Sequence, residues 1–189
     1  MFDESKELLS ALGLPVVHAP SEAEAQCAYM AQKGVVWAAA SQDYDTLLFG
    51  APRLVLNLTL SEKRKMGGGI VYIAPYLIEL ETVLKTLKIT QDQLLVLGIL
   101  TGTDYAPKGV PGIGPKKALK LVQSGHSFED IFSQFTVDFD WKEILSTFKN
   151  IPVADVSLTQ GKLNEDAVKE MLVDRHDFSL ERVENTLAK

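Results

Sequence analysis

The sequence of 189 residues contains a single cysteine, Cys27, and only three histidines. One thiol excludes an internal disulfide and any zinc or iron–sulfur site that needs several cysteines. The histidines, His18, His126 and His176, are scattered along the chain, so we expect structural or surface roles for them.

Long apolar runs and a secretory signal are also absent. No apolar run approaches the roughly 20 residues that a membrane-spanning helix needs. Residues 1–6 contain no basic segment followed by an apolar stretch, which is the pattern of a secretory signal. We therefore expect a protein without a membrane segment, in the cytoplasm, or in the nucleus if its source is eukaryotic.

The formal net charge of −6 alone argues weakly against nucleic acid as a partner. The distribution of the charges matters more than their sum. Basic residues cluster at 63–65 and at Lys108, Lys116, Lys117 and Lys120, while several acidic residues form motifs of their own. A nuclease needs both kinds of cluster, because cations bind the DNA backbone and carboxylates bind the metals that assist its cleavage.

Helical and strand-like patterns alternate through the first hundred residues, which predicts an α/β layered fold with a short, mainly parallel sheet. We expect helices at 4–12, ended by Gly13, from Ser21 to Gly34, at 45–49, from Pro75 onward, and from the cap Thr90 to about Leu100. We expect strands at 15–19, 35–40, 53–59 and 70–74, with a turn or flexible loop at 61–69.

The character changes at residues 102–114, which are rich in glycine and proline. We place a domain boundary here, between an α/β core at 1–105 and an all-helical region at 106–189. The helical region is predicted to contain short helices at about 115–124, 127–134, 139–149, 164–174 and 179–188.

The first acidic motif, Ser21-Glu22-Ala23-Glu24, fits a capping box with Ser21 at the N-cap and Glu24 three positions later. Taken alone, it favours capping over a functional role by roughly four to one. Capping does not explain Glu22, however. The positive potential of a helix N-terminus keeps nearby carboxylates ionised, and magnesium binds ionised carboxylates.

The second and third acidic motifs also lie at the ends of predicted elements. Asp43 and Asp45 follow the strand at 35–40, and residues two apart in an extended segment point the same way. A solvated turn explains this pair about equally well. Asp104 follows a thoroughly apolar helix, where a turn residue is also plausible. Three acidic motifs at element termini, taken together, favour one shared site.

Phosphodiester hydrolysis is a reaction that such a cluster of carboxylates could support. Two divalent ions about 3.5–4 Å apart can convert water to hydroxide and neutralise charge on the phosphate. Magnesium favours oxygen ligands, so a carboxylate cluster serves and histidine is not required. We therefore predict two Mg²⁺ ions, with Mn²⁺ as a substitute.

The segment 109–118, Gly-Val-Pro-Gly-Ile-Gly-Pro-Lys-Lys-Ala, is the most specific local signal. Its glycines permit a tight turn, and a helix N-terminus that begins with proline offers free N–H groups to an anion. The pattern is that of a helix-hairpin-helix, and an ordinary glycine turn has odds of roughly one in five. The predicted DNA-binding residues are Gly112, Gly114, Lys116, Lys117 and Lys120. The basic run at 63–65 is as readily a solvated loop as a second DNA contact.

Taken in order, these motifs resemble the flap endonucleases, most of all the archaeal ones. The resemblance rests on the residues at 19–26, 41–45, 102–105, 112–114 and 176–178. It implies a PIN-like nuclease core and a helix-hairpin-helix that holds duplex DNA and a potassium ion. It also implies that the metal ligands, direct or through water, are Glu22, Glu24, Asp43, Asp45 and Asp104.

Members of that family cut 5′ flaps and junctions in DNA replication and repair. The resemblance therefore predicts a hydrolase: a metal-dependent, structure-specific 5′ endonuclease or exonuclease. The family's N-terminal region, with further aspartates and a helical arch, has no counterpart here, and we expect the chain alone to be incomplete. A cognate N-terminal subunit or a second copy is the expected partner, and binding of a sliding clamp through this chain is not expected.

Two other interpretations stay open. The chain could be a duplex-DNA-binding module or the subunit of a split nuclease, keeping the helix-hairpin-helix without cutting. A base-excision glycosylase also carries such hairpins, but it leaves the acidic α/β half unexplained and lacks the iron–sulfur cysteines.

Overall fold

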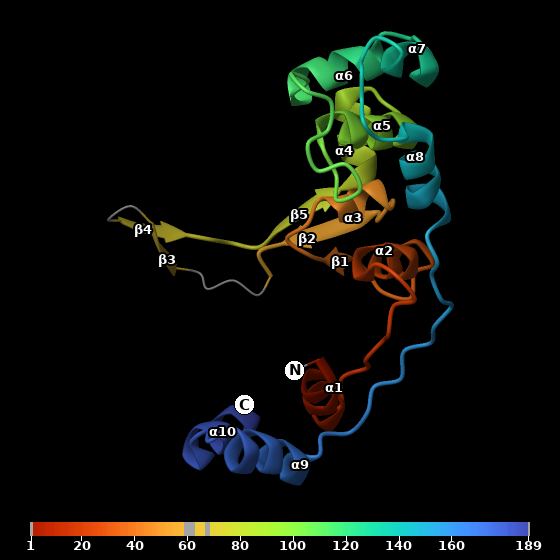
Figure 1. The fold of residues 1–189 in the computed structure, drawn as a ribbon. Coiled ribbons are helices and arrows are strands. Elements are labelled where there is room, and N and C mark those ends of the chain that lie inside the picture. Colours follow the sequence, from red (N-terminus) through yellow and green to blue (C-terminus); the bar gives the residue numbers. More distant parts are fainter. Residues whose placement is uncertain (1, 59–62, 67–68, 189) are drawn as a thin grey trace. The chain divides into compact units, whose positions relative to one another are not determined.

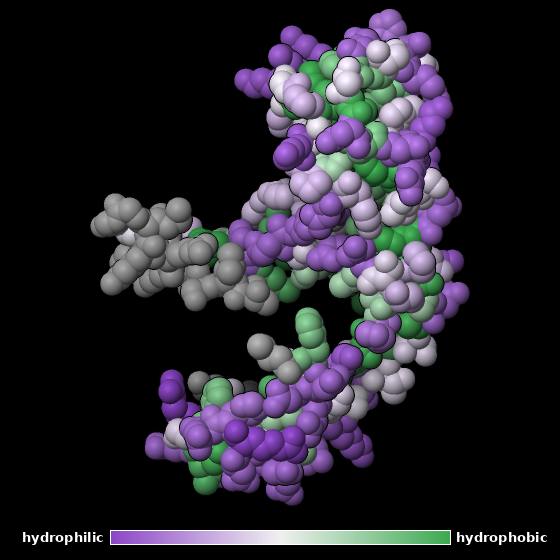
Figure 2. Space-filling model, in the orientation of Figure 1, coloured by the Kyte–Doolittle hydropathy of each residue, from purple (hydrophilic) through white to green (hydrophobic). Residues whose placement is uncertain are grey.

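The computed structural model describes residues 2–58, 63–66 and 69–188. The chain forms two compact units: a terminal unit (residues 1–18 and 156–189) and a central unit (residues 19–155). Figure 1 shows both in ribbon form. Hydrophilic side chains cover most of the face drawn in Figure 2, with apolar atoms visible in smaller patches. No helix in the described ranges is long and apolar enough to cross a membrane.

A small mixed sheet lies in the central unit, with the strand order β1-β2-β5. β1 is parallel to β2, and β5 is antiparallel to it. Leu54 and Leu56 alternate with less buried neighbours along β2, so one face of this strand enters the core. The strands are β1 (Ala39–Ala40), β2 (Arg53–Leu56) and β5 (Tyr76–Glu79).

The sheet differs from the predicted one in three places. The strand predicted at 53–59 forms as β2 but ends at Leu56, and residue 59 lies outside the described ranges. The expected strand at 35–40 is reduced to its last two residues. The segment after Pro75, predicted as helix, first forms β5 and becomes helical only at Leu80. The apolar residues of this segment are compatible with a helix or a strand, and hydrogen bonding to the backbone of β2 makes it a strand.

A separate hairpin stands where a loop was expected. β3 (Lys63–Met66) pairs antiparallel with β4 (Gly69–Tyr72), so the loop prediction for 61–69 is wrong at 63–66 and at 69. The predicted strand at 70–74 exists as β4, but its partner is β3 rather than the main sheet. Residues 61–62 and 67–68 lie outside the described ranges.

Helix α5 is the centre of the core. It is apolar around its whole circumference, as expected of a helix buried on every side, and it packs against α6 and α8. Thr90 and Gln93 form the capping box that begins it. The helices of the central unit are α2 (Ala23–Gln32), α3 (Asp45–Leu48), α4 (Leu80–Leu87), α5 (Gln91–Thr101), α6 (Pro115–Gln123), α7 (Phe128–Phe132) and α8 (Trp141–Asn150).

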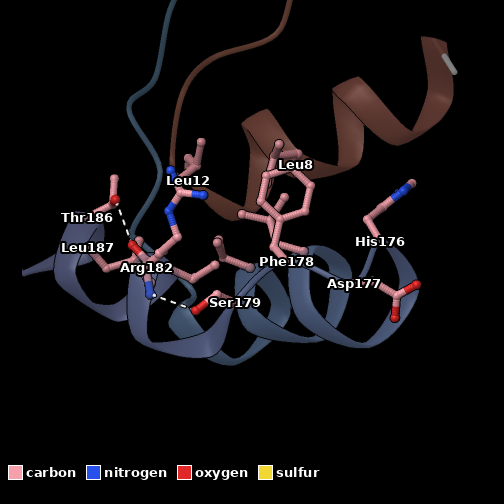
Figure 3. Close-up of a pocket in the computed structure, with 12 residues that line it drawn as sticks. Leu8, Leu12, His176, Asp177, Phe178, Ser179, Arg182, Thr186 and Leu187 are labelled. Atoms are coloured by element: carbon pink, nitrogen blue, oxygen red, sulfur yellow. Dashed lines mark hydrogen bonds between the residues drawn. The ribbon is translucent and has the colours of Figure 1, made fainter.

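The terminal unit joins the two ends of the described chain. Gly13 ends α1 at φ 76°, and its carbonyl accepts a 2.9 Å hydrogen bond from Gly161 N. Arg175 donates to both Glu7 and Glu170, each at 3.0 Å. A pocket of about 610 Å³, lined mainly by leucine, valine and Phe178, lies among its helices (Figure 3). These are α1 (Phe2–Ala11), α9 (Glu165–Lys169), the π-helical turn η1 (Glu170–Arg175) and α10 (Leu180–Leu187).

The strand predicted at 15–19 is not formed. A strand needs a paired neighbour, and in the described part of the chain no strand pairs with this segment. The short helices predicted after residue 114 are all present. An α/β core followed by helices confirms the predicted fold class. The boundary near residue 105 falls inside the central unit, and the division there stays a prediction.

Candidate functional site

Asp43 and Asp45 are fixed by a tight turn before α3. Asp45 is the first residue of that helix, and its N–H donates to Asp43 Oδ1 at 2.9 Å. The Asp43 N–H donates to Ser41 Oγ at 3.0 Å, and Thr46 Oγ1 donates to the Asp43 carbonyl at 2.9 Å. The interpretation of this motif as a turn is therefore right, and it leaves the Asp45 carboxylate available to a site.

Asp104 stands on the loop that follows α5. Gly102 allows the sharp exit, because its φ of 121° disfavours other residues and a Cβ there would lie 2.8 Å from the Pro107 carbonyl oxygen. Thr103, only 6% exposed, pairs with Ala106 in a short bridge. This anchored loop fixes the backbone from which Asp104 projects.

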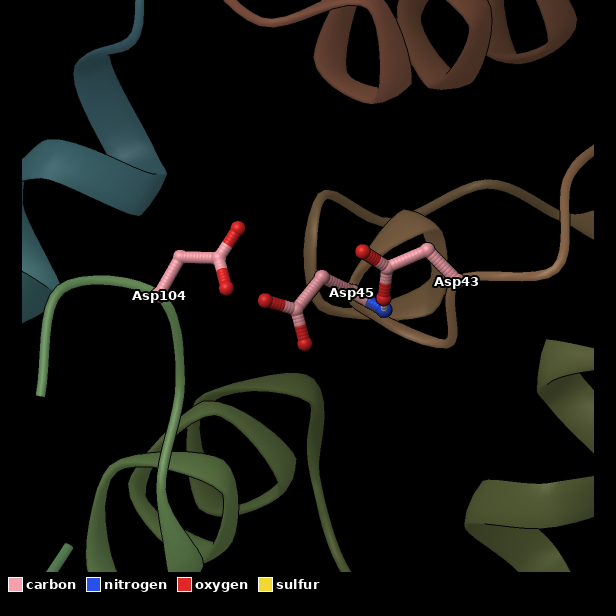
Figure 4. A group of neighbouring side chains, drawn as sticks. All are labelled: Asp43, Asp45 and Asp104. Atoms are coloured by element: carbon pink, nitrogen blue, oxygen red, sulfur yellow. Dashed lines mark hydrogen bonds between the residues drawn. The ribbon is translucent and has the colours of Figure 1, made fainter. Parts of the chain in front are cut away.

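The three aspartates converge although two segments of the chain supply them (Figure 4). One carboxylate oxygen from each of Asp43, Asp45 and Asp104 lies within 4.8 Å of the others. Asp43 and Asp104 are exposed, and Asp45 is half-buried between them. We call this group the aspartate cluster.

The electrostatics of the aspartate cluster are unfavourable without a cation. Burial first, and then the charges of Asp43 and Asp104, together raise the pKa of Asp45 from 3.8 to about 6. A divalent cation would offset this repulsion, and hard cations take oxygen ligands. The donor set thus fits a metal ion, and the cluster could hold one.

Glu22 and Glu24, which we call the glutamate pair, line the same small pocket as the aspartate cluster. The pocket has a volume of about 20 Å³, close to that of one water-sized sphere. Ser41 Oγ donates to Glu24 at 3.5 Å, and the Tyr105 hydroxyl donates to Glu22 at 3.3 Å. All five acids proposed from the sequence therefore border one cavity.

The predicted capping box at the start of α2 is wrong. Glu22, not Ser21, occupies the N-cap, and no side chain makes a capping hydrogen bond. Because the N-cap lies one residue later than expected, Glu24 is the second residue of the helix rather than the third. The carboxylate of neither glutamate makes a capping hydrogen bond, so both carboxylates are available to the pocket.

An aromatic group supports the pocket and was not anticipated from the sequence. Phe148 of α8 lies with its ring centroid 4.9 Å from Phe49 and 5.3 Å from Tyr105, and the latter two line the pocket. Burial, followed by the charge of Glu22, raises the pKa of Tyr105. Tyr105 could have been suspected from its place beside Asp104, but nothing local connects Phe148 to the motifs.

The predicted DNA-binding segment forms one contiguous feature elsewhere in the central unit. Gly112 has φ 78° with open space around it, and Gly114 is the N-cap of α6, followed by Pro115. Lys117 Nζ donates to the Gly112 carbonyl at 3.0 Å. The other lysines predicted to bind DNA, Lys116 and Lys120, are also exposed. We call this feature the glycine–lysine turn.

Known proteins resemble the chain along its whole length. Residues 13–104, which include all five acids, match the XPG I-region family. The chain is 51% identical over 200 residues to Flap endonuclease 1 of Caldivirga maquilingensis, and 51% identical over 194 residues to that of Pyrococcus abyssi. Each match covers 100% of this chain and 56% of the relative, so the chain spans about half the length of these curated relatives.

Solved structures agree. Flap endonuclease-1 from Methanococcus jannaschii superposes with a TM-score of 0.87 at 44% identity, covering 100% of this chain and 56% of that one. Human GEN1 in complex with Holliday junction DNA superposes with a TM-score of 0.75 at 26% identity, covering 99% and 51%. The catalytic core of Rad2 with DNA, at 22% identity and a TM-score of 0.79, shares the fold.

Proposed function

The chain belongs to the flap endonuclease family, and we propose that it carries the metal-binding and duplex-holding parts of a structure-specific 5′ nuclease. Its PIN-like core and helical region are those of the family's fold. The observation that carries the proposal is the convergence of the glutamate pair and the aspartate cluster on one pocket. Bringing these carboxylates together is electrostatically unfavourable, and a bound cation would offset that cost.

We propose that the pocket binds Mg²⁺, with two ions at work during cleavage and Mn²⁺ as a substitute. Divalent ions supply an activated water and neutralise charge on the scissile phosphate and leaving oxygen. The aspartate cluster would hold the ion directly, because its oxygens already lie within 4.8 Å of one another. The glutamate pair would serve as further ligands, direct or through water. Tyr105 and Ser41 orient these two glutamates by hydrogen bonds.

The proposed substrate is DNA with a 5′ flap or a junction, acted on in replication and repair. The glycine–lysine turn would hold the phosphates of the adjoining duplex through the free N–H groups at the start of α6 and the charges of its lysines. A K⁺ ion at the turn, coordinated by backbone oxygens, is part of this proposal. These contacts read no bases, so specificity would come from the shape of the DNA.

A partner along the edge of the sheet belongs to the same proposal. β1 is an edge strand, and the large side chains just before it, Val35 and Trp37, are 38% and 61% exposed. An open edge invites pairing with another strand. We propose that a cognate subunit or a second copy covers it. We also propose that the protein works in the cytoplasm.

One alternative is a duplex-binding module that does not cut. The observation that favours it is that the glycine–lysine turn is fully formed in a chain that spans only 56% of its relatives' length. Such a module would bind flap DNA and leave it intact, whatever the metal.

Cleavage of a 5′-flap DNA in Mg²⁺ tests the proposal, with and without the N-terminal half of an archaeal relative supplied in trans. Asp43→Asn and Asp104→Asn should each abolish cleavage with little loss of DNA binding. Asp138→Asn, an exposed acid away from the pocket, is the control and should cleave normally. Unchanged cleavage in both pocket variants would eliminate the site. Binding without cleavage in every wild-type mixture would favour the module.

A further inference from the structure

Gln26 is a buried polar side chain on the helix that carries the glutamate pair. It lies one turn after Glu22 in α2 and is only 2% exposed. Its amide donates to the Ala154 carbonyl at 2.9 Å and accepts from the Ala154 N–H at 2.8 Å. This two-way bond pairs a side chain with a distant backbone in the manner of neighbouring strands, and it satisfies both polar atoms of the buried amide.

A second bond joins the same two segments. Tyr29, three residues after Gln26 and therefore on the same side of α2, donates from its hydroxyl to Asp155 Oδ1 at 2.7 Å. We call residues 151–155 the strap, since they run from the end of α8 to these two contacts. The strap therefore connects α2 to the helix whose Phe148 supports the wall of the pocket.

The first turn of α2 is packed through a small side chain, Ala25, which is 2% exposed. Further along α2, Ala28 forms a small buried cluster with Ala39 and Ala51. Alanine methyl groups interlock weakly, so they resist rotation and sliding of a helix less than large side chains do. No capping bond fixes Glu22, which instead accepts the 3.3 Å bond from Tyr105. Ser41 and Tyr105 hold the two carboxylates, and the hydrogen bonds from the strap add directional contacts to the body of the helix one turn further on.

We propose that Gln26 is a positioning residue that holds the glutamate pair against the aspartate cluster by binding Ala154. The inference rests on the metal site of the proposed function and goes beyond it, since Gln26 touches neither metal nor DNA. Outer groups that orient the ligands of a metal commonly change its affinity by about 10- to 100-fold when removed. Removal of the Gln26–Ala154 bonds should therefore weaken metal binding while the fold persists.

Mn²⁺ binding to the 189-residue chain, measured by isothermal titration calorimetry, tests this inference. Gln26→Met keeps the length of the side chain and removes both hydrogen bonds, and we expect about tenfold weaker Mn²⁺ binding. Gln32→Met is the matched control. Gln32 lies at the far end of the same helix and also makes two bonds, to the carbonyls of Phe49 and Gly50, at 2.9 Å each. Its replacement should lower the melting temperature and leave Mn²⁺ affinity unchanged.

Tyr29→Phe is a milder variant that keeps the ring and removes only the bond to Asp155, and we expect a two- to threefold decrease in affinity, below the usual range of such effects. If Gln26→Met does not fold, this variant decides alone. Equal Mn²⁺ affinity in wild type and the folded Gln26 and Tyr29 variants would overturn the inference and leave the metal site standing. Wild type that binds no Mn²⁺ would overturn the metal site itself, so the two failures are distinguishable.

Discussion

The acidic pocket and the glycine–lysine turn differ in how the chain builds them. The pocket draws its acids from the start of α2, the turn before α3 and the loop after α5, with Phe148 of α8 behind it. The glycine–lysine turn lies within residues 109–120 and completes itself locally, down to the bond from Lys117 to Gly112. The pocket therefore forms only when distant segments fold together, whereas the glycine–lysine turn is formed almost entirely by residues that are neighbours in the sequence.

This difference has an electrostatic consequence. Burying a carboxylate and gathering others around it costs free energy, as the pKa of Asp45 indicates, which is raised first by burial and then by the neighbouring charges. Tertiary packing must offset this cost. Exposed lysines at a helix N-terminus bear no comparable cost, because water and salt screen them. Variants of the acidic pocket should therefore change metal binding, and variants of the glycine–lysine turn should change DNA binding.

The largest expected effect comes from removing two acids at once. Asp43→Asn with Asp104→Asn deletes two of the three charges of the aspartate cluster, and we expect Mn²⁺ affinity to fall by more than about 100-fold. Duplex binding in the absence of divalent metal should not weaken, since the deleted charges repel phosphate. Calorimetry and fluorescence anisotropy measure the two quantities. A parallel decrease in duplex binding would contradict the separation of the two regions.

The complementary change removes two lysines. Lys116→Ala with Lys117→Ala should weaken duplex binding about tenfold on every sequence and flatten its dependence on salt by about one unit for each phosphate that is no longer bound. Mn²⁺ affinity should stay the same. Lys142→Ala with Lys149→Ala removes equal charge from two lysines of α8 that are paired with Glu129 and Asp92. A salt slope changed equally by both pairs would show that net charge, not the turn, governs binding.

What could be predicted from the sequence follows the same division. The cap at Thr90, the stop at Gly13 and the turn that begins α6 depend on residues close in the chain, and all three were predicted correctly. The roles proposed for the lysines remain predictions. Local chemistry suffices here because a cap or turn is formed by its own neighbours.

Features that depend on distant partners were predicted less well. β5 looked helical because its apolar residues suit both elements, and its pairing with β2 settled the matter. Residues Ser21 to Glu24 match the sequence pattern of a capping box. The helix nevertheless begins later, and the two glutamates line the pocket. Bonds to the strap such as that of Gln26 with Ala154, 128 residues apart, leave no local signal.

Phe148 allows a smaller test of long-range support. Phe148→Leu removes the ring that contacts Phe49 and Tyr105, and should lower the free energy of unfolding by about 1–2 kcal/mol and Mn²⁺ affinity by a few fold. Phe132→Leu is the control, because Phe132 is 4% exposed and stacks on Trp141 at 4.7 Å, away from the pocket. Urea unfolding should show similar destabilisation in both, and calorimetry should separate them. Equal Mn²⁺ affinities would mean that the aromatic group supports the core alone.

The smallest expected effect is the most specific, because its sign depends on the metal. The Asp45 pKa of about 6 lies above its ordinary 3.8, so the folded chain binds this proton more tightly than the unfolded chain. Without metal, Asp45 therefore makes stability fall as pH rises from about 4 to 6. The shift corresponds to about 3 kcal/mol, and solvent screening of this half-exposed group reduces it to about 1 kcal/mol.

Asp45→Asn should remove that fall and stabilise the metal-free chain at pH 7 by about 1 kcal/mol. Saturating Mg²⁺ should reverse the trend in wild type, since the ion binds only the ionised carboxylate and its stabilisation grows as pH passes 6. Urea unfolding at pH 4–7, with and without Mg²⁺, measures both slopes, and the difference between wild type and variant isolates Asp45 from other acids. If that difference keeps the same sign in Mg²⁺, Asp45 does not contact the ion, and the acidic pocket lacks its central ligand.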